Sequence, residues 1–223
     1  MEPLKKTKNF DGRQGPVVLA ILDGVGIGSC TEGDIVSKAS TPTLDWLSQN
    51  ALSSQLKAHG EAVGMPSDSD MGNSEIGHNA IGCGRVFAQG AKLVNESIES
   101  RALLEGAVWK ELIQNANDHK SALHFIGLLS DGNVHSHIDH LEALLKAAKD
   151  EGIKNAYVHI LLDGRDVPPT SALDYVDRLE SYLSELNSGS NVDYAIASGG
   201  GRMQITMDRY HANWGMVELG WKT

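Results

Sequence analysis

Residues 68–78 read DSDMGNSEIGH and bring two serines, a histidine and three carboxylates into one short polar stretch. Ser74 lies where a helix can begin, so by frequency its hydroxyl is expected to cap that helix. The alternative is a nucleophile, which must be activated by a base, by a lowered pKa or by a metal. Because the sequence has neither a Ser-His-Asp order nor a G-x-S-x-G elbow, metal activation remains for this alternative. The spacing assigns no metal ligand among the neighbouring residues Asp68, Asp70, Glu75 and His78.

Four apolar runs end in Asp-Gly or Gly-Gly and then present Asp, His or Arg: LDGVG, LLSDGNVHSH, LLDGRD and ASGGGR. One such end is explained as a turn, but turns do not require His or Arg, so four together indicate a site. Asp23 in the first run could ligate a divalent cation or simply be a turn residue. His135 and His137 follow the second run, where an extended backbone would point them the same way, unless the loop is merely solvated.

The last two runs supply arginines. Arg165 and Asp166 are expected to form an oriented pair, and an arginine can bind phosphate or carboxylate through two parallel hydrogen bonds. Arg202 follows three glycines, which would let the backbone approach an anion closely, and Arg209 stands at the start of the next expected helix. Together with a histidine, these residues predict a pocket for a small, multiply charged anion. A phosphoryl transfer would need both this pocket and a metal-bound nucleophile.

The elements that must position these residues alternate regularly in the second half of the chain. Apolar runs predict strands and amphipathic stretches predict helices, the pattern of a parallel α/β sheet that binds ligands beyond the carboxyl ends of its strands. The expected strands are 121–132, 155–166 and 192–201, and the expected helices are 136–152, 170–186 and 207–221.

The first part of the chain contains less regular structure. A strand is expected at 16–24, a helix at 41–51, a short helix from Ser74 and another at 91–104. One strand cannot close a core, so we expect residues 1–88 to be part of a domain whose other strands lie elsewhere, and 89–223 to begin a second domain. The chain stops in ELGWKT at the end of a helical pattern, which suggests a fragment.

Composition narrows the class of protein. The net charge of −10 argues against a nucleic-acid partner, and no apolar run approaches the ~20 residues that would span a membrane. The N-terminus has no apolar h-region, so no secretory signal is expected. Cys30 and Cys83 have neither metal-pair nor disulfide spacing, which favours a cytoplasmic location.

The ordered motifs LDGVGIG, DSDMGNSEIGHNAIGCGRV, LLSDGNVHSHIDHL, LDGRDVPP and ASGGGRM…MDRY closely resemble the cofactor-independent phosphoglycerate mutases of the alkaline phosphatase superfamily. The resemblance spans about residue 16 to the end. It implies interconversion of 3-phosphoglycerate and 2-phosphoglycerate with two divalent cations, Mn²⁺ most often, with Mg²⁺ or Co²⁺ as alternatives. It also implies an α/β architecture: an alkaline-phosphatase-like segment plus an inserted parallel-sheet transferase domain, both incomplete in this chain.

The same resemblance assigns roles by motif. Asp23 resembles a metal ligand, and Ser74 resembles both a ligand and the nucleophile that becomes phosphoserine. His135 resembles a substrate contact that could also relay a proton. The other residues that resemble substrate or anion contacts are Arg165, Asp166, Arg202 and Arg209.

Family members are considerably longer, and only Asp23 and Ser74 match their metal ligands here. We therefore expect this chain alone to bind metal weakly and to have no mutase activity, and the full-length enzyme to be monomeric. Two alternatives remain open. One is another metal-dependent phosphomutase or phosphatase of the superfamily, against which DGRD and VHSH count. The other is a non-catalytic module that binds phosphoglycerate.

Overall fold

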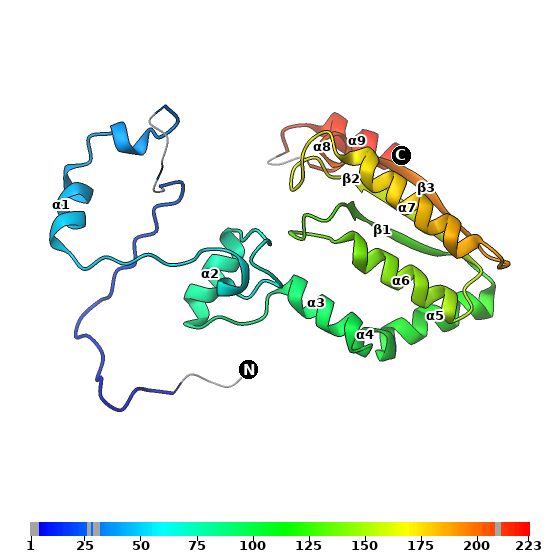
Figure 1. The fold of residues 1–223 in the computed structure, drawn as a ribbon, viewed down its shortest axis with the longest axis horizontal. Coiled ribbons are helices and arrows are strands. Elements are labelled where there is room, and N and C mark those ends of the chain that lie inside the picture. Colours follow the sequence, from blue (N-terminus) through cyan, green and yellow to red (C-terminus); the bar gives the residue numbers. More distant parts are fainter. Residues whose placement is uncertain (1–4, 26–27, 29–31, 208–210) are drawn as a thin grey trace. The chain divides into compact units, whose positions relative to one another are not determined.

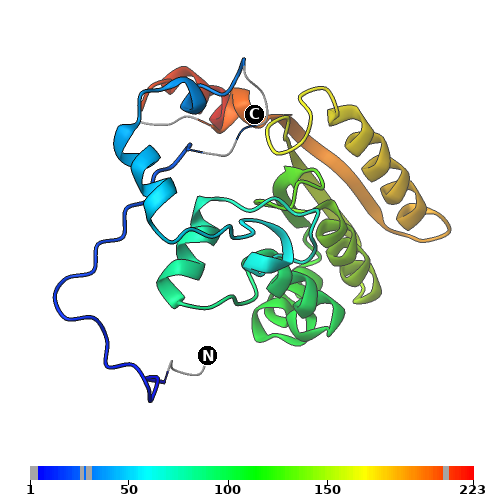
Figure 2. The ribbon, with the colours of Figure 1, turned by 60° about the vertical axis from the view of Figure 1, so that its left-hand side comes forward.

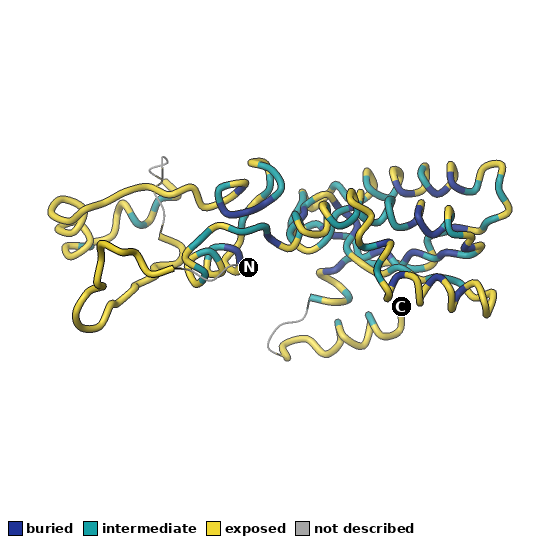
Figure 3. The backbone as a smooth tube through the Cα atoms, turned by 90° about the horizontal axis from the view of Figure 1, so that it is seen from below, coloured by how far each residue is buried: buried dark blue, intermediate teal, exposed yellow. Residues whose placement is uncertain are grey.

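A computed structural model of the chain describes residues 5–25, 28, 32–207 and 211–223. It divides into two compact units, Met1–Gln55 and Leu56–Thr223. Figure 3 shows that buried positions recur along the helices and strands of the second unit, whereas the first unit is almost entirely exposed. In the described part of the chain, no helix is both long enough and apolar enough to cross a bilayer.

The first unit contains the 3-10 helix η1 (Val36–Lys38) and helix α1 (Pro42–Asn50). The helix predicted at 41–51 is confirmed, with Pro42 in its first turn. The strand predicted at 16–24 is not formed, and Val17 and Val18 are 79% and 86% exposed. A strand needs a partner, and the described residues of this unit form no other strand with which it could pair.

The second unit begins with five helical segments. These are η2 (Gly60–Val63), α2 (Ser74–Cys83), α3 (Gly90–Glu99), α4 (Ala102–Glu105) and α5 (Ala107–His119). The helix expected at 91–104 is split into α3 and α4, because Arg101 adopts a left-handed backbone conformation with φ of 62°. Helix α5 was not predicted, and its Trp109 and Ile113 are buried in the core.

The sheet has three parallel strands in the order β1 (Leu123–Leu129), β2 (Asn155–Leu162) and β3 (Asp193–Gly201). Helices α6 (Ile138–Asp150) and α7 (Ala172–Asn187) connect them, so the predicted strand–helix alternation is confirmed. After β3 come the short helix α8 (Arg202–Ile205) and α9 (Trp214–Lys222), where one helix was expected at 207–221. Every strand therefore ends at the same edge of the sheet.

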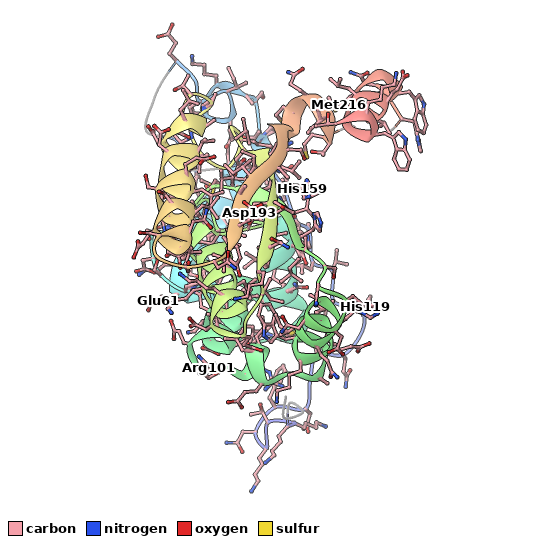
Figure 4. The ribbon with its side chains drawn as sticks, turned by 90° about the vertical axis from the view of Figure 1, so that its right-hand side faces the viewer. Glu61, Arg101, His119, His159, Asp193 and Met216 are labelled. Carbon is pink, nitrogen blue, oxygen red and sulfur yellow. The ribbon has the colours of Figure 1, made fainter. Side chains whose placement is uncertain are left out.

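Helices α6 and α7 pack side by side on one face of this sheet (Figures 1 and 2). Leu145, Leu179 and Leu183 from the helices meet Ala156 and Val158 of β2 in the main core. Alternate strand residues point the other way: Ile126 is 77% exposed, and Figure 4 shows His159 on the side away from α7. The alternation fixes the strand-end loops on a rigid two-layer support.

Candidate active site

Helix α2 carries the serine that the sequence singled out. The helix begins at Ser74, but its N-cap is Asn73, whose side-chain oxygen accepts a hydrogen bond from the Ile76 N–H at 3.0 Å. The expectation that Ser74 itself caps the helix is therefore wrong, because Asn73 performs that role one residue earlier. Ser74 is exposed, so its hydroxyl is free for other contacts at the positive end of the helix dipole.

His78 lies one helical turn after Ser74 and contacts it twice. Its Nδ1 is 2.8 Å from the backbone oxygen of Ser74 and 3.2 Å from Ser74 Oγ. Because a carbonyl oxygen can only accept, the shorter contact assigns the proton to Nδ1. In that tautomer His78 donates toward Oγ and is not arranged to remove the hydroxyl proton. It could instead stabilise negative charge on Oγ.

The DGRD turn after β2 is organised by Asp163, a residue that the sequence motifs did not single out. Asp163 is 4% exposed, and its carboxylate accepts hydrogen bonds from the backbone N–H groups of Arg165 and Asp166, at 3.1 and 3.0 Å. The hydroxyl of Ser130, at the end of β1, also donates to it at 2.6 Å. These bonds turn the chain so that Arg165 is exposed and Asp166 is half-buried. An Asp as the first residue of a turn was the available signal.

Arg202 completes the Asp163 cluster. Its guanidinium is 3% exposed and donates to Asp163 and Asp166, each at 2.7 Å. Burial raises the pKa of Asp163, but the hydrogen bonds from Ser130, the turn N–H groups and Arg202 outweigh it and hold that pKa below its usual value. Arg202 is thus paired inside the protein, and its predicted role as an anion contact remains a prediction.

The glycines before Arg202 allow a close approach between neighbouring elements, while the approach to an anion proposed on the sequence stays a prediction. A Cβ on Gly199 would lie 2.4 Å from a side-chain carbon of Ile160, and one on Gly200 would lie 2.8 Å from a side-chain carbon of Ile205. The close approach that glycine permits here is therefore to neighbouring isoleucines. It lets β3 pack tightly against β2 and α8, which places Arg202 beside Asp163.

A cavity of about 730 Å³ opens beside these strand ends. Its walls come from residues 66–71, from α3, from the loops after β1 and β2, and from Tyr175 of α7. Asp166 lines it, whereas the described arginines and His135 do not. The lining is acidic: its ionisable carboxyl and imidazole groups are those of Asp70, Glu99, Asp131, Asp139, Asp166, His137 and His140. This cavity therefore lacks the basic lining expected of an anion pocket.

Comparison with known proteins identifies the family. Residues 94–223, more than half of the chain, match the family model described as BPG-independent PGAM N-terminus. The chain belongs to this family. It is 52% identical, over 98% of its length, to a probable 2,3-bisphosphoglycerate-independent phosphoglycerate mutase of Leptospira interrogans, of which it covers 40%. A phosphoglycerate mutase of this type from Trypanosoma brucei is 48% identical over 92% of the chain, which covers 37% of it.

A match to a solved structure supports the family assignment. It is a crystal structure of Leishmania mexicana phosphoglycerate mutase at low cobalt concentration, and it matches with a TM-score of 0.79 and 46% identity. The match covers 91% of this chain and 37% of that chain. The chain thus spans about two fifths of the length of the curated relatives it matches.

Within this member of the family, the predicted site residues lie in different parts of the structure. Asp163 accepts hydrogen bonds from the backbone N–H groups of Arg165 and Asp166 and from the Arg202 guanidinium, while His135 lies exposed in the loop after β1. Asp23 is exposed and belongs to the first unit, whereas Ser74 belongs to the second. Arg209 lies outside the described residues. Sequence reasoning did not assign Asn73, His78, Ser130 or Asp163, although each has a contact that defines the site.

The donors for a metal are few. Among the residues that the structure describes, no group of three or more His, Cys, Asp or Glu side chains could hold a metal ion. Asp23 and Ser74 offer two oxygens, fewer than a divalent cation requires from its ligands. The donor set described in this chain therefore does not fit a two-metal centre by itself.

Proposed function

We propose that this chain is the N-terminal portion of a cofactor-independent phosphoglycerate mutase that interconverts 3-phosphoglycerate and 2-phosphoglycerate through phosphoserine at Ser74. The observation that carries the proposal is the position of Ser74. It is the first residue of α2, and Asn73 has already taken the capping role. A nucleophile at a helix N-terminus is well placed to receive a phosphoryl group, because backbone N–H groups and the helix dipole favour negative charge there.

The proposed reaction has two transfers. In the first, the Ser74 oxygen bonds to phosphorus as the bond from phosphorus to one substrate oxygen breaks, and the Ser74 proton ends on that departing oxygen. In the second, the other hydroxyl of the bound glycerate attacks the phosphoserine, and its proton returns to the Ser74 oxygen. His78 donates toward Oγ and would stabilise charge on that oxygen during each transfer. Glycerate must stay bound between the transfers, since water would otherwise hydrolyse the phosphoserine.

The substrate contacts proposed are His135, Arg165 and Asp166, with Arg202 and Arg209 as further anion contacts. Asp163 supports this role of the DGRD turn, because its carboxylate fixes the backbone of Arg165 and Asp166. Asp166 would accept hydrogen bonds from the glycerate hydroxyls. Arg165 is exposed and can offer two parallel N–H groups to a phosphate or carboxylate.

Divalent cations are part of the proposal, with Mn²⁺ first and Mg²⁺ or Co²⁺ as alternatives. The Leishmania mexicana structure, obtained at low cobalt concentration, supports a metal requirement in the family. Two ions are proposed, with Asp23 and Ser74 among the ligands. Since the described donors do not complete such a centre, the other ligands must come from outside the residues that the structure describes.

The test uses the full-length protein that contains this chain, assayed in both directions with 3-phosphoglycerate and 2-phosphoglycerate. We expect turnover, a phosphorylated peptide containing Ser74, and loss of both in Ser74→Ala. Ser181→Ala, an exposed serine of α7 that bonds only its own helix, is the matched control and should keep full turnover. Turnover that persists in Ser74→Ala would overturn the proposal. Binding of phosphoglycerate without turnover in the parent protein would favour a non-catalytic module instead.

The proposal also covers the partners, the location and the oligomeric state of the protein. Phosphoglycerate is the proposed partner, with neither nucleic acid nor membrane as a target, because the net charge is −10 and no described helix could span a bilayer. A cytoplasmic location and a monomeric full-length enzyme complete the proposal.

A further inference from the structure

One hydrogen bond joins the segment that leads into Ser74 to the loop that contains His135. The side-chain amide of Asn133 donates to Asp70 Oδ1 at 2.6 Å, across 63 positions of the sequence. Asp70 precedes Ser74 by four residues, and Asn133 precedes His135 by two residues. Both residues line the cavity of about 730 Å³ beside the strand ends. The proposed chemistry gives neither of them a role.

Asp70 is also fixed by hydrogen bonds within residues 60–70. Its other carboxylate oxygen accepts from the backbone N–H and the hydroxyl of Ser67, at 2.8 and 2.7 Å, and its backbone oxygen accepts from Gly60. Burial raises the pKa of Asp70, but the hydrogen bonds from Asn133 and Ser67 outweigh it and leave that pKa lowered. The carboxylate therefore stays ionised and is a strong acceptor for an amide.

Asn133 is equally constrained. It is 8% exposed and has a left-handed backbone with φ of 56°, a conformation that asparagine tolerates better than most residues. Its backbone N–H donates to Ser136 O, and the Ile138 N–H donates to Ser130 O, so the loop from β1 to α6 is closed on itself. His135 lies within that closed loop. Moving Asn133 would therefore move the whole loop.

We propose that Asp70 and Asn133 are positioning residues. Their hydrogen bond sets the register, meaning the relative position of the Ser74 segment and the His135 loop, so that Ser74 and His135 face the same ligand. This inference rests on the proposed function, because it assumes that both segments serve the same reaction. A second bridge, between His140 of α6 and Asn95 of α3, borders the same cavity. That bridge ties α3 to the sheet layer, while the Asp70–Asn133 bond ties the Ser74 segment itself.

Exchanging the Asp and Asn side chains between positions 70 and 133 can distinguish a change in register from a general loss of stability. In Asp70→Asn the bond can persist only between two neutral amides, with the Asn133 side chain turned over so that its oxygen accepts, and this is weaker than the bond to a carboxylate. In Asn133→Asp two carboxylates meet at hydrogen-bond distance, which repels at neutral pH. In the double variant, Asn at 70 can accept from Ser67 and donate to Asp at 133, so all partners are matched again.

The experiment measures the distance between α2 and α7 in the 223-residue chain. Spin labels are placed on the native Cys83 at the end of α2 and on Leu173→Cys, a 71% exposed position of α7, in a Cys30→Ser background. Double electron–electron resonance should give one narrow distance distribution in the parent. Each single variant should give a broader distribution with longer distances at pH 7.5, and the double variant should restore the narrow one.

Acid provides a second readout. In Asn133→Asp the mutual repulsion raises the pKa of one carboxyl, so a shared proton should restore the narrow distribution near pH 5. Asn115→Asp, the same chemical change at an exposed position of α5, should leave the distribution unchanged at both pH values. An unaltered distribution in folded Asn133→Asp at pH 7.5, or a double variant as broad as the single ones, would overturn the inference.

The full-length protein links this inference to the proposed function. The single variants should lose at least tenfold in kcat, and the double variant should regain most of the loss. If the parent protein has no mutase turnover, the proposed function fails while the distance measurement still decides the register. If distances respond but kcat does not, the inferred role of the pair in catalysis is overturned.

Discussion

At the scale of single residues, the buried carboxylate of Asp163 holds the DGRD turn. It accepts from two turn N–H groups, from Ser130 and from Arg202, and it joins the ends of all three strands. We predict that Asp163→Asn lowers the free energy of unfolding by about 3 kcal/mol, because Arg202 would lose one of its two buried carboxylate partners. Urea unfolding followed by circular dichroism measures this loss.

A surface pair serves as the control for that prediction. Asp150→Asn removes a carboxylate from the exposed pair with Lys146 and should cost less than about 1 kcal/mol. The pKa of Asp163 is lowered in the folded protein, so its ionised form contributes stability above its unfolded value of about 4. That contribution is lost as the pH falls through the folded value. The difference between parent and Asp163→Asn should therefore shrink below about pH 4, and a difference that stays constant there would contradict the assignment.

The sequence predicted residues with distinctive chemistry better than it predicted their partners. Arg165, Asp166 and Arg202 were expected near one another, and Asp163 does bond the Arg202 guanidinium and the backbone N–H groups of the other two. The Arg165 side chain itself is exposed. The sequence could not reveal that Arg202 is buried, because its pairing depends on how closely β3 approaches β2. The capping role of Asn73 was also missed, since a helix that could begin at either of two polar residues is ambiguous in sequence.

At the scale of elements, the glycines at the end of β3 determine how closely that strand packs. We predict that Gly199→Ala lowers the free energy of unfolding by roughly 2 kcal/mol, because the new Cβ would overlap the Ile160 side chain. Gly77→Ala in α2 is the matched control. A Cβ there meets nothing within 4 Å, so alanine should raise the free energy of unfolding by about 0.5–1 kcal/mol. Equal effects in the two variants would mean that packing at Gly199 is looser than described.

Helices and strands with regularly spaced apolar residues could be predicted from the sequence, whereas elements that depend on a distant partner or on a single residue could not. Helices α6 and α7 and the three strands follow from apolar periodicity, because each buries one face against the same core. The run at 16–24 has the composition of a buried strand, yet forms none, since sheet pairing depends on partners rather than on composition. The break between α3 and α4 depends on the left-handed backbone of Arg101, which the spacing of apolar residues does not predict.

At the scale of the whole molecule, the described residues supply only part of what the proposed reaction needs. The chain covers 40% of its Leptospira interrogans relative, and the described part holds no group of three metal-ligating side chains. The division into domains at residues 88 and 89 remains a prediction. The compact units separate between Gln55 and Leu56, and the family match begins at residue 94. Ser74 therefore belongs to the same compact unit as the strand-end residues.

This distribution of donors leads to a prediction for the isolated chain. We expect the purified 223-residue protein to show no mutase turnover with saturating Mn²⁺, because Asp23 and Ser74 alone cannot complete the coordination of a divalent cation. A coupled assay with 3-phosphoglycerate measures turnover, and calorimetry measures Mn²⁺ binding, which should be weak. The full-length protein under the same conditions is the positive control. Turnover by the 223-residue chain would show that its own side chains suffice, and the missing ligands proposed here would then be unnecessary.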